Sequence, residues 1–304
     1  MTTRDGILIV DKPEGLTSAE VVRRVKGRRR LKVGHLGTLD PFATGVLPLC
    51  VGEGTKIAQF LNAADKRYEG VIRLGAATDT GDRTGTTVRE AAVPDLTDAA
   101  LREVERRFTG EYTQIPPMYS AIKQSGVPLY RLARQGVEVE RDSRSVRLEG
   151  LRLTRSEDSR LSFDVTCSKG TYVRVLAEDI GARLGTVAHL EVLRRTRFGP
   201  FDLSRAVGLR DADPLAHENV LSVRDALAHL PSFALADRAA QAARKGQGWV
   251  LRGLDGPEGE LATLVDPQGH VVAVVVRRSG RWEYGRVLQG PALQPGTPVL
   301  SEQD

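Results

Sequence analysis

One carboxylate, Asp40, lies in the segment best suited to chemistry, residues 34–47, Gly-His-Leu-Gly-Thr-Leu-Asp-Pro-Phe-Ala-Thr-Gly-Val-Leu. Three glycines give this segment backbone angles and close approaches that other residues cannot adopt: Gly34, Gly37 and Gly45. Pro41 disfavours helical geometry at Asp40. A single acid held in a tight loop beside His35 is suited to catalysis. Because Asp-Pro also commonly starts an ordinary turn, the local pattern leaves both interpretations open.

The spacing of these residues also resembles a known signature. At every position the segment matches Gly-His-x-Gly-Thr-Leu-Asp-Pro-x-Ala-x-Gly-Val-Leu, which is similar to the signature of the TruB family of tRNA pseudouridine synthases. Four further segments resemble the family in the same order along the chain: residues 12–18, 66–68, 116–123 and 170–174. One such match could be chance, but the whole ordered set indicates a relationship. The resemblance implies an enzyme that isomerises uridine 55 in the T arm of tRNA to pseudouridine.

By this resemblance, the expected catalytic residues are Asp40, Tyr68 and Arg174. Asp40 would be a nucleophile at ribose C1′ or uracil C6, or else a base on the ribose, and the sequence leaves these routes open. A desolvated carboxylate needs a nearby cation to stay ionised, and Arg174 is the expected one. The alternative for Arg174 is an exposed pair worth under about 1 kcal/mol. Tyr68 is expected to stack on the uracil and to help remove its C5 proton, although a strand tyrosine is most often a packing residue.

The resemblance also implies a set of residues that bind or position the substrate: His35, Tyr172, Leu193, Lys12 and Pro13. Because the target base must leave its stack before it can react, His35 is expected to fill the gap that remains. A lone histidine is more often structural, which is the alternative. Tyr172 is expected to pack in the uridine pocket and Leu193 to line it. Lys12 and Pro13 are expected to support the catalytic loop.

Composition and charge restrict the class of protein. The 304 residues are sufficient for one large and one small domain, and the net charge of +5 is compatible with a polyanionic partner. Cys50 and Cys167 belong to no metal-ligand spacing and fit a reducing cytosol, so no metal is expected. The N-terminus lacks the apolar core of a signal peptide, and no run of about 20 apolar residues could cross a membrane. Pseudouridine formation involves no redox change, so we expect a cytoplasmic enzyme without a cofactor.

Apolar and amphipathic segments must position these residues. Residues 7–10 are predicted to form a buried strand, and Thr17 with Glu20 fits a capping box that starts a helix. Residues 23–32, here called the basic segment, carry seven cations in ten positions. They form either a solvated face or a contact with RNA backbone. Residues 171–176 are predicted to form a strand, on which Tyr172 and Arg174 would leave the same face because they are two residues apart.

One long segment has little periodicity. Residues 110–145 combine isolated tyrosines with arginines, a composition that suits a flexible flap over nucleic acid. In the TruB family the corresponding segment grips the RNA. Residues 261–265, 271–276 and 282–287 are predicted to be short strands of a small barrel or sandwich. This end of the chain resembles the PUA RNA-binding module.

The predicted fold is α+β. We expect a pseudouridine-synthase catalytic domain with a mixed, largely antiparallel central sheet in residues 1–230, and a small β-rich, PUA-like domain in residues 231–304. The expected partner is the T-arm stem-loop of tRNA, bound by a monomer that needs no protein partner and no membrane.

Two other functions remain open at this point. A guide-RNA-dependent relative would share the Asp loop but rely on partner proteins, and such relatives generally lack an insertion at 110–145. A non-catalytic RNA binder or tRNA-folding chaperone would have no need of Asp40, Tyr68 and Arg174 together. Assistance with tRNA folding could also accompany catalysis.

Overall fold

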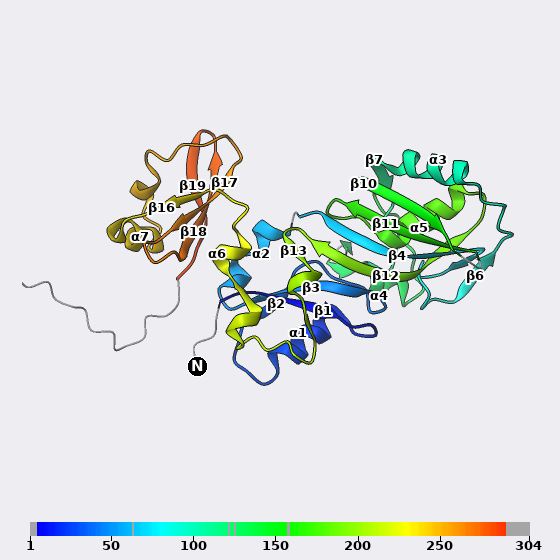
Figure 1. The fold of residues 1–304 in the computed structure, drawn as a ribbon, viewed down its shortest axis with the longest axis horizontal. Helices are drawn as coiled ribbons and strands as arrows, with labels where there is room; N and C mark the ends of the chain where they lie inside the picture. Colours follow the sequence, from blue (N-terminus) through cyan, green and yellow to red (C-terminus); the bar gives the residue numbers. More distant parts are fainter. Residues whose placement is uncertain (1–4, 63, 121, 125, 157–158, 290–304) are drawn as a thin grey trace, which may run out of the picture.

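The structure, a computed structural model, describes residues 5–289 apart from residues 63, 121, 125, 157 and 158. One large sheet runs through most of the molecule, and a smaller sheet lies at one end (Figure 1). No helix in these described ranges has the length and apolar character needed to span a membrane.

The large sheet is mixed and largely antiparallel, as predicted. Its main path runs β14-β1-β3-β12-β4-β11-β10-β7. The pairs β1–β14 and β3–β12 are parallel, and the other pairs along this path are antiparallel. The strands of the path are β1 (Gly6–Lys12), β3 (Thr44–Val51), β4 (Lys66–Leu74), β7 (Gly110–Gln114), β10 (Arg144–Arg155), β11 (Arg160–Cys167), β12 (Ala188–Phe198) and β14 (Val207–Gly208). Three short strands pair beside it: β2 (Val33–His35) with β3, β13 (Phe201–Asp202) with β12 and β15 (Val220–Ser222) with β1.

Strand β1 is apolar on both faces because both are covered. Leu8 and Val10 belong to a core with side chains of α1, α3 and α5, whereas Ile7 and Ile9 belong to a second core with α2 and α6. Successive side chains of a strand point to opposite faces, so the four-residue apolar run predicts a strand of this buried kind. The helices are α1 (Ser18–Lys26), α2 (Gly54–Leu61), α3 (Asp98–Phe108), α4 (Leu129–Ala133), α5 (Val173–Arg183), α6 (Val223–Ala226) and α7 (Asp237–Arg244), with 3-10 turns η1 (Leu203–Arg205), η2 (His217–Asn219) and η3 (Gly248–Leu251).

Helix α1 begins with the predicted capping box. The Glu20 N–H donates to Thr17 Oγ1 at 3.1 Å, and the Thr17 N–H donates to the Glu20 carboxylate at 2.8 Å. These bonds satisfy two of the backbone donors that a helix start leaves free. The helix carries the first residues of the basic segment on its exposed face.

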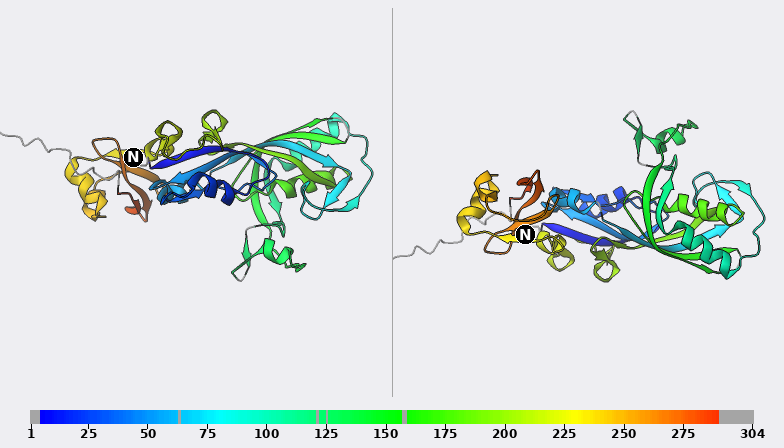
Figure 2. Two further views of the ribbon diagram at one scale, coloured as in Figure 1. Left: turned by 90° about the horizontal axis from the view of Figure 1, so that it is seen from below. Right: turned by 90° about the horizontal axis from the view of Figure 1, so that it is seen from above.

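The insertion, here residues 115–143, is shorter than the predicted segment. The ends of residues 110–145 are strands β7 and β10, which pair with each other at the edge of the large sheet. The prediction of little regular structure is therefore wrong for these ends. Between them lie α4 and a hairpin of β8 (Lys123–Gln124) and β9 (Val127–Pro128). Figure 2 shows that the insertion projects from the same side of the sheet that carries α1 and α5. A second hairpin pairs β5 (Ala76–Thr78) with β6 (Thr87–Glu90).

A small C-terminal β domain follows the large sheet. Its strands run in the order β16-β17-β18-β19, with bounds β16 (Ser232–Ala234), β17 (Leu261–Val265), β18 (Val271–Arg278) and β19 (Arg281–Val287). The three strands predicted in this region are confirmed. Val274 and Leu288 pack in the same core as Ile57 of α2, so this domain contacts the large one. The boundary between residues 230 and 231 stays a prediction, and residues 290–304 of that domain lie outside the described residues.

The strand predicted at residues 171–176 is wrong. Helix α5 begins at Val173, so Tyr172 is its N-cap residue, with extended backbone, and Arg174 lies in the first helical turn. The helix buries every residue from Val173 to Ala177. A short apolar run that is buried all round has no distinguishing periodicity, so the sequence pattern could not separate helix from strand. Tyr172 and Arg174 therefore do not share a strand face.

Candidate active site

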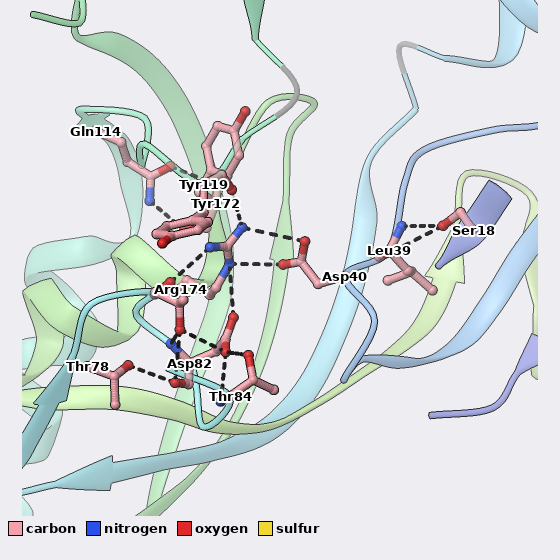
Figure 3. Close-up of polar contacts among 11 residues, drawn as sticks. Ser18, Leu39, Asp40, Thr78, Asp82, Thr84, Gln114, Tyr119, Tyr172 and Arg174 are labelled. Atoms are coloured by element: carbon pink, nitrogen blue, oxygen red, sulfur yellow. Dashed lines mark hydrogen bonds and ion pairs between the residues drawn. The ribbon is translucent and has the colours of Figure 1, made fainter. Parts of the chain in front are cut away.

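Asp40 lies in the loop between β2 and β3, residues 36–43, here called the Asp40 loop. The buried hydroxyl of Ser18 holds the residue before it: Ser18 Oγ accepts from the Leu39 N–H at 2.9 Å and donates to the Leu39 carbonyl at 3.1 Å. Ser18 is the first residue of α1, so the helix start anchors the loop. Figure 3 shows the Asp40 side chain pointing from this loop toward Arg174.

Lys12 holds the residue after Asp40. Its ammonium group donates to the Pro41 carbonyl at 3.1 Å and to the Pro13 carbonyl at 2.9 Å, and the Gly15 N–H also donates to Pro41, at 2.8 Å. Lys12 is fully buried. Burial lowers the pKa of Lys12 to about 8, although the Asp40 carboxylate opposes this. Lys12 and Gly15 therefore both bond to the Pro41 carbonyl of the Asp40 loop, and the support expected from Lys12 and Pro13 stays a prediction.

Arg174 and Asp40 form an ion pair. Arg174 Nε lies 2.9 Å from Asp40 Oδ2, and Arg174 Nη2 lies 3.5 Å from Oδ1 (Figure 3). The same guanidinium donates to the carbonyls of Thr80, at 2.9 Å, and Tyr119, at 2.8 Å. Arg174 is only 5% exposed. A buried guanidinium with its donors paired in this way is held in one orientation, so it presents a fixed positive charge to Asp40.

A second carboxylate, Asp82, faces Arg174 from the loop after β5. Its Oδ2 lies 3.8 Å from Arg174 Nε, and its Oδ1 accepts from the Thr84 N–H at 2.9 Å, the Thr84 hydroxyl at 2.6 Å and the Thr80 hydroxyl at 3.0 Å. Sequence reasoning missed Asp82, since nothing in its local pattern points to Arg174. The pairing of its loop with Leu190 of β12 brings it into the site.

The pKa of Asp40 reflects opposing effects. Burial raises the pKa of the Asp40 carboxyl above its ordinary value, the Arg174 guanidinium lowers it, and the Asp82 carboxylate raises it. Lys12 adds a smaller lowering effect. The Arg174 and Lys12 cations therefore favour the ionised form of a poorly solvated carboxylate, against the larger effect of burial.

Tyr68 lies on β4, buried in the core that also contains Leu39 and Leu193. Burial raises the pKa of its phenol to about 12; the Arg195 guanidinium lowers this pKa and the Asp40 carboxylate raises it. The phenol is therefore protonated at neutral pH, and it lies close enough to Asp40 for the carboxylate charge to affect its pKa. Leu193 of β12 pairs with Gly70 of β4 and is also buried.

Tyr172 is held beside Arg174 by a side-chain amide. The Tyr172 N–H donates to Gln114 Oε1 and Gln114 Nε2 donates to the Tyr172 carbonyl, both at 3.0 Å (Figure 3). Gln114, buried at the end of β7, is a second residue that sequence reasoning missed. The guanidinium of Arg144 lies 5.6 Å from the centre of the Tyr172 ring. Residues of β7 and β10, the strands that flank the insertion, thus hold the Tyr172 ring in place.

His35 lies on β2, opposite Leu49 of β3, and is half-buried. Its Nδ1 is buried, and no hydrogen-bond partner for it occurs among the described residues. Burial lowers the pKa of the imidazole, and the Arg195 charge lowers it further. His35 is therefore a neutral ring at the start of the Asp40 loop. The structure brings the eight predicted residues to one region, but their roles stay predictions.

This arrangement can support nucleophilic and acid–base chemistry. It offers one carboxylate, a guanidinium held against it and a protonated phenol. In the described part of the chain, no three His, Cys, Asp or Glu side chains gather as they would around a metal ion.

Comparisons with known proteins identify the family. Residues 23–173 match the family model for the N-terminal domain of TruB family pseudouridylate synthases, and residues 174–227 match that for the C-terminal domain of tRNA pseudouridylate synthase B. The chain is 44% identical to tRNA pseudouridine synthase B of Geobacter sulfurreducens, covering 91% of this chain and 95% of that protein. It is 48% identical to the tRNA pseudouridine synthase B of an Azoarcus species, covering 92% of each.

The fold has a solved counterpart. A chain from the crystal structure of a Cbf5–Nop10–Gar1 complex superposes with a TM-score of 0.71 at 26% identity, covering 93% of this chain and 85% of that one. The sequence relatives and the matched models extend over both the Asp40 loop and Arg174. The chain therefore belongs to the TruB family of pseudouridylate synthases.

Proposed function

We propose that this protein isomerises uridine 55 in the T arm of tRNA to pseudouridine. Family membership makes the chain a pseudouridine synthase, and relatives at 44% and 48% identity bear the name tRNA pseudouridine synthase B, which supports tRNA as the substrate. The observation that carries the proposal is the Asp40–Arg174 ion pair, 2.9 Å long and almost fully buried on the arginine side.

The reaction breaks the bond between ribose C1′ and uracil N1 and rejoins C1′ to C5. Asp40 acts as the nucleophile at C1′ or C6, or as a base on the ribose, and Arg174 keeps it ionised. Tyr68 stacks on the uracil, and its phenol assists the loss of the C5 proton after the base has turned. The Asp40 charge acts on the pKa of the phenol, which supports placing Tyr68 near Asp40 and the uracil. Because burial keeps the phenol protonated, Tyr68 can take up the C5 proton only while it passes its own proton to water or to a nearby carboxylate.

Base flipping brings the uridine to Asp40. The reacting atoms are covered when the base is stacked in folded RNA, so the nucleotide must leave the stack first. A neutral imidazole can occupy the gap by stacking, and the lowered pKa of His35 supports that neutral state. Tyr172 and Leu193 line the pocket for the flipped base, and Lys12 and Pro13 support the Asp40 loop.

Two basic parts of the chain are the RNA contacts in this proposal. The insertion and α1 project from the same side of the large sheet, and Asp40 follows α1 along the chain (Figure 2). The insertion carries Arg131 and Arg134, the latter over the Tyr130 ring at 5.7 Å. The exposed cations of the basic segment are suited to phosphate contacts: Arg23, Arg24, Lys26, Arg28, Arg29, Arg30 and Lys32.

The protein acts alone in this proposal, as a monomer without a cofactor, and works in the cytoplasm where tRNA is modified. The presence of the insertion supports this form over a guide-RNA-dependent one. Purified protein, given only a T-arm stem-loop, is therefore expected to convert one uridine. Conversion that requires added proteins or a guide RNA would favour the guide-dependent alternative.

The direct test compares wild type with Asp40→Asn on an unmodified tRNA transcript, with Asp98→Asn as the control. Asp98 is an exposed carboxylate at the start of α3. Pseudouridine is measured by tritium release from 5-tritiated uridine, and RNA binding by filter retention. We expect Asp40→Asn to bind RNA but to convert none, and Asp98→Asn to behave as wild type. Binding by both wild type and Asp40→Asn without conversion would favour the chaperone function, and turnover by Asp40→Asn would refute the mechanism.

A further inference from the structure

Arg195 is a fully buried cation at the centre of β12, and the mechanism above gives it no role. In the sheet its backbone pairs with Gly45 of β3 on one side and with Tyr68 of β4 on the other. Its exposed fraction is 0%, so the side chain is out of reach of bulk solvent. Burying a guanidinium is costly unless its donors are well paired, which raises the question of what this one holds.

The guanidinium of Arg195 binds the start of the Asp40 loop and the strand that follows the loop, β3. Nη2 donates to the Gly37 carbonyl and Nε donates to the Val46 carbonyl, each at 2.8 Å. The planar guanidinium therefore bridges Gly37, at the start of the loop, and Val46, within β3. The face of the guanidinium lies over the Phe198 ring, 5.2 Å from its centre, which fixes its plane.

The glycines of the Asp40 motif fit against Arg195. A Cβ atom on Gly37 would lie 2.4 Å from the Phe198 ring and 3.2 Å from Arg195 Nη1, and a Cβ on Gly45 would lie 2.2 Å from the Arg195 carbonyl oxygen. Both glycines also have positive φ, +58° and +103°. Side chains are thus excluded at the two points where the motif approaches Arg195.

We infer that Arg195 is a positioning residue for the Asp40 loop, because it attaches the start of that loop and the following strand β3 to β12, which pairs with the Tyr68 strand β4. The inference rests on the proposed function, since it concerns the same reaction. The Arg195 guanidinium also interacts with the Tyr68 phenol, so Arg195 acts through the loop and through Tyr68 and not on the substrate itself. The Asp40 carboxylate and the Tyr68 phenol are then held at a fixed relative position, because the Asp40 loop and β4 are both attached to Arg195.

The electrostatic environment agrees with this location. The Arg195 charge lowers the pKa of Lys12, His35 and Tyr68. Burial also lowers the pKa of Lys12 and His35, whereas it raises that of Tyr68. All three belong to the predicted site. A neutral core side chain of the same volume would fill the space between Phe198 and the loop, but it could donate to neither carbonyl.

The test is Arg195→Lys, with Arg197→Lys as the control, because Arg197 is exposed on the same strand. Lysine keeps the charge but cannot donate to both carbonyls from a fixed fork. We expect Arg195→Lys to bind the T-arm RNA within about twofold of wild type while its single-turnover rate at saturating RNA falls by about tenfold or more. The Arg197→Lys variant should match wild type in both. A loss of rate without loss of affinity is a result that a purely structural role would not produce.

A second variant approaches the contact from the loop. Gly37→Ala introduces a methyl group against Phe198 and Arg195, whereas Gly34→Ala, in the same motif, meets nothing within 4 Å. We expect folded Gly37→Ala to lose rate and Gly34→Ala to keep it. If Arg195→Lys does not fold, the comparison of Gly37→Ala with Gly34→Ala still tests the inference.

Three results would overturn the inference. Wild-type rates in Arg195→Lys or in folded Gly37→Ala would show that the contact is not needed. Equal losses of rate and RNA affinity would indicate a binding defect, and unfolding of both variants would assign Arg195 to core stability alone. Absence of pseudouridine with wild type is a different outcome, which would reject the proposed function itself.

Discussion

Removal of one hydroxyl group, in Ser18→Ala, should separate the positioning of Asp40 from its chemistry. Ser18 is 1% exposed and forms two hydrogen bonds with the backbone of Leu39, which is itself 3% exposed. Alanine fits the space without a clash, so the substitution deletes these bonds and little else. The Leu39 N–H and carbonyl then remain buried, with no other hydrogen-bond partner among the described residues.

The magnitude follows from those two groups. An unpaired buried backbone donor or acceptor costs about 1–3 kcal/mol, so the two groups together should lower the free energy of unfolding by at most about 2–6 kcal/mol. Part of this cost can be relieved if the loop shifts toward other partners. That shift moves Asp40 away from Arg174, and a displacement near 1 Å costs up to about 100-fold in rate. We expect a loss of about 10- to 100-fold, because the Arg174 ion pair opposes the movement.

The assay combines urea unfolding with single-turnover pseudouridine formation at saturating tRNA. Ser204→Ala is the matched control, because Ser204 is exposed and, within the described part of the chain, its hydroxyl bonds to the nearby Asp202 side chain alone. That variant should unfold within about 0.5 kcal/mol of wild type and retain its rate. The reasoning is refuted if Ser18→Ala matches Ser204→Ala in both measurements, since the Leu39 backbone would then have no need of the hydroxyl.

Three further predictions concern charge. In Arg174→Gln the cation that lowers the Asp40 pKa is lost, so the acidic limb of the pH–rate profile should move to higher pH; an unmoved limb would contradict the ion pair. In Asp82→Asn a charge that raises the Asp40 pKa is lost, so the same limb should move to lower pH, and the two opposite shifts serve as controls for each other. Replacing Arg28 and Arg30 with alanine should reduce the slope of log affinity against log salt by about 1 to 2, measured by RNA titration, while the saturating rate stays unchanged. An unchanged slope would remove the basic segment from the RNA contacts.

Much of the fold followed from local patterns. The apolar run at residues 7–10 predicted a strand covered on both faces, and Thr17 with Glu20 predicted a helix start that the structure contains. These patterns are informative because the periodicity of apolar residues and the chemistry of a helix end depend on neighbours in sequence. The helix at Val173 was mistaken for a strand because its first turns are buried all round, which removes that periodicity.

For the candidate site too, residues in local motifs could be predicted, whereas residues brought in by long-range contacts could not. The ordered motifs identified Asp40, Arg174 and Tyr68, and the structure pairs Asp40 with Arg174. Asp82, Gln114 and Arg195 carry no local signal, since an isolated acid, amide or arginine in a sequence is most often exposed.

By itself, the sequence determined the family, the acid of the site and most of the elements, because motifs and periodicity are properties of short segments. Only the tertiary structure decided what surrounds that acid. Strand pairing brings Arg195 beside the glycines of the Asp40 loop, and the packing of α5 brings Arg174 between Asp40 and Asp82. Hydrogen bonds and charges act over a few ångströms regardless of separation along the chain, so these partners became visible only when the sheet was formed.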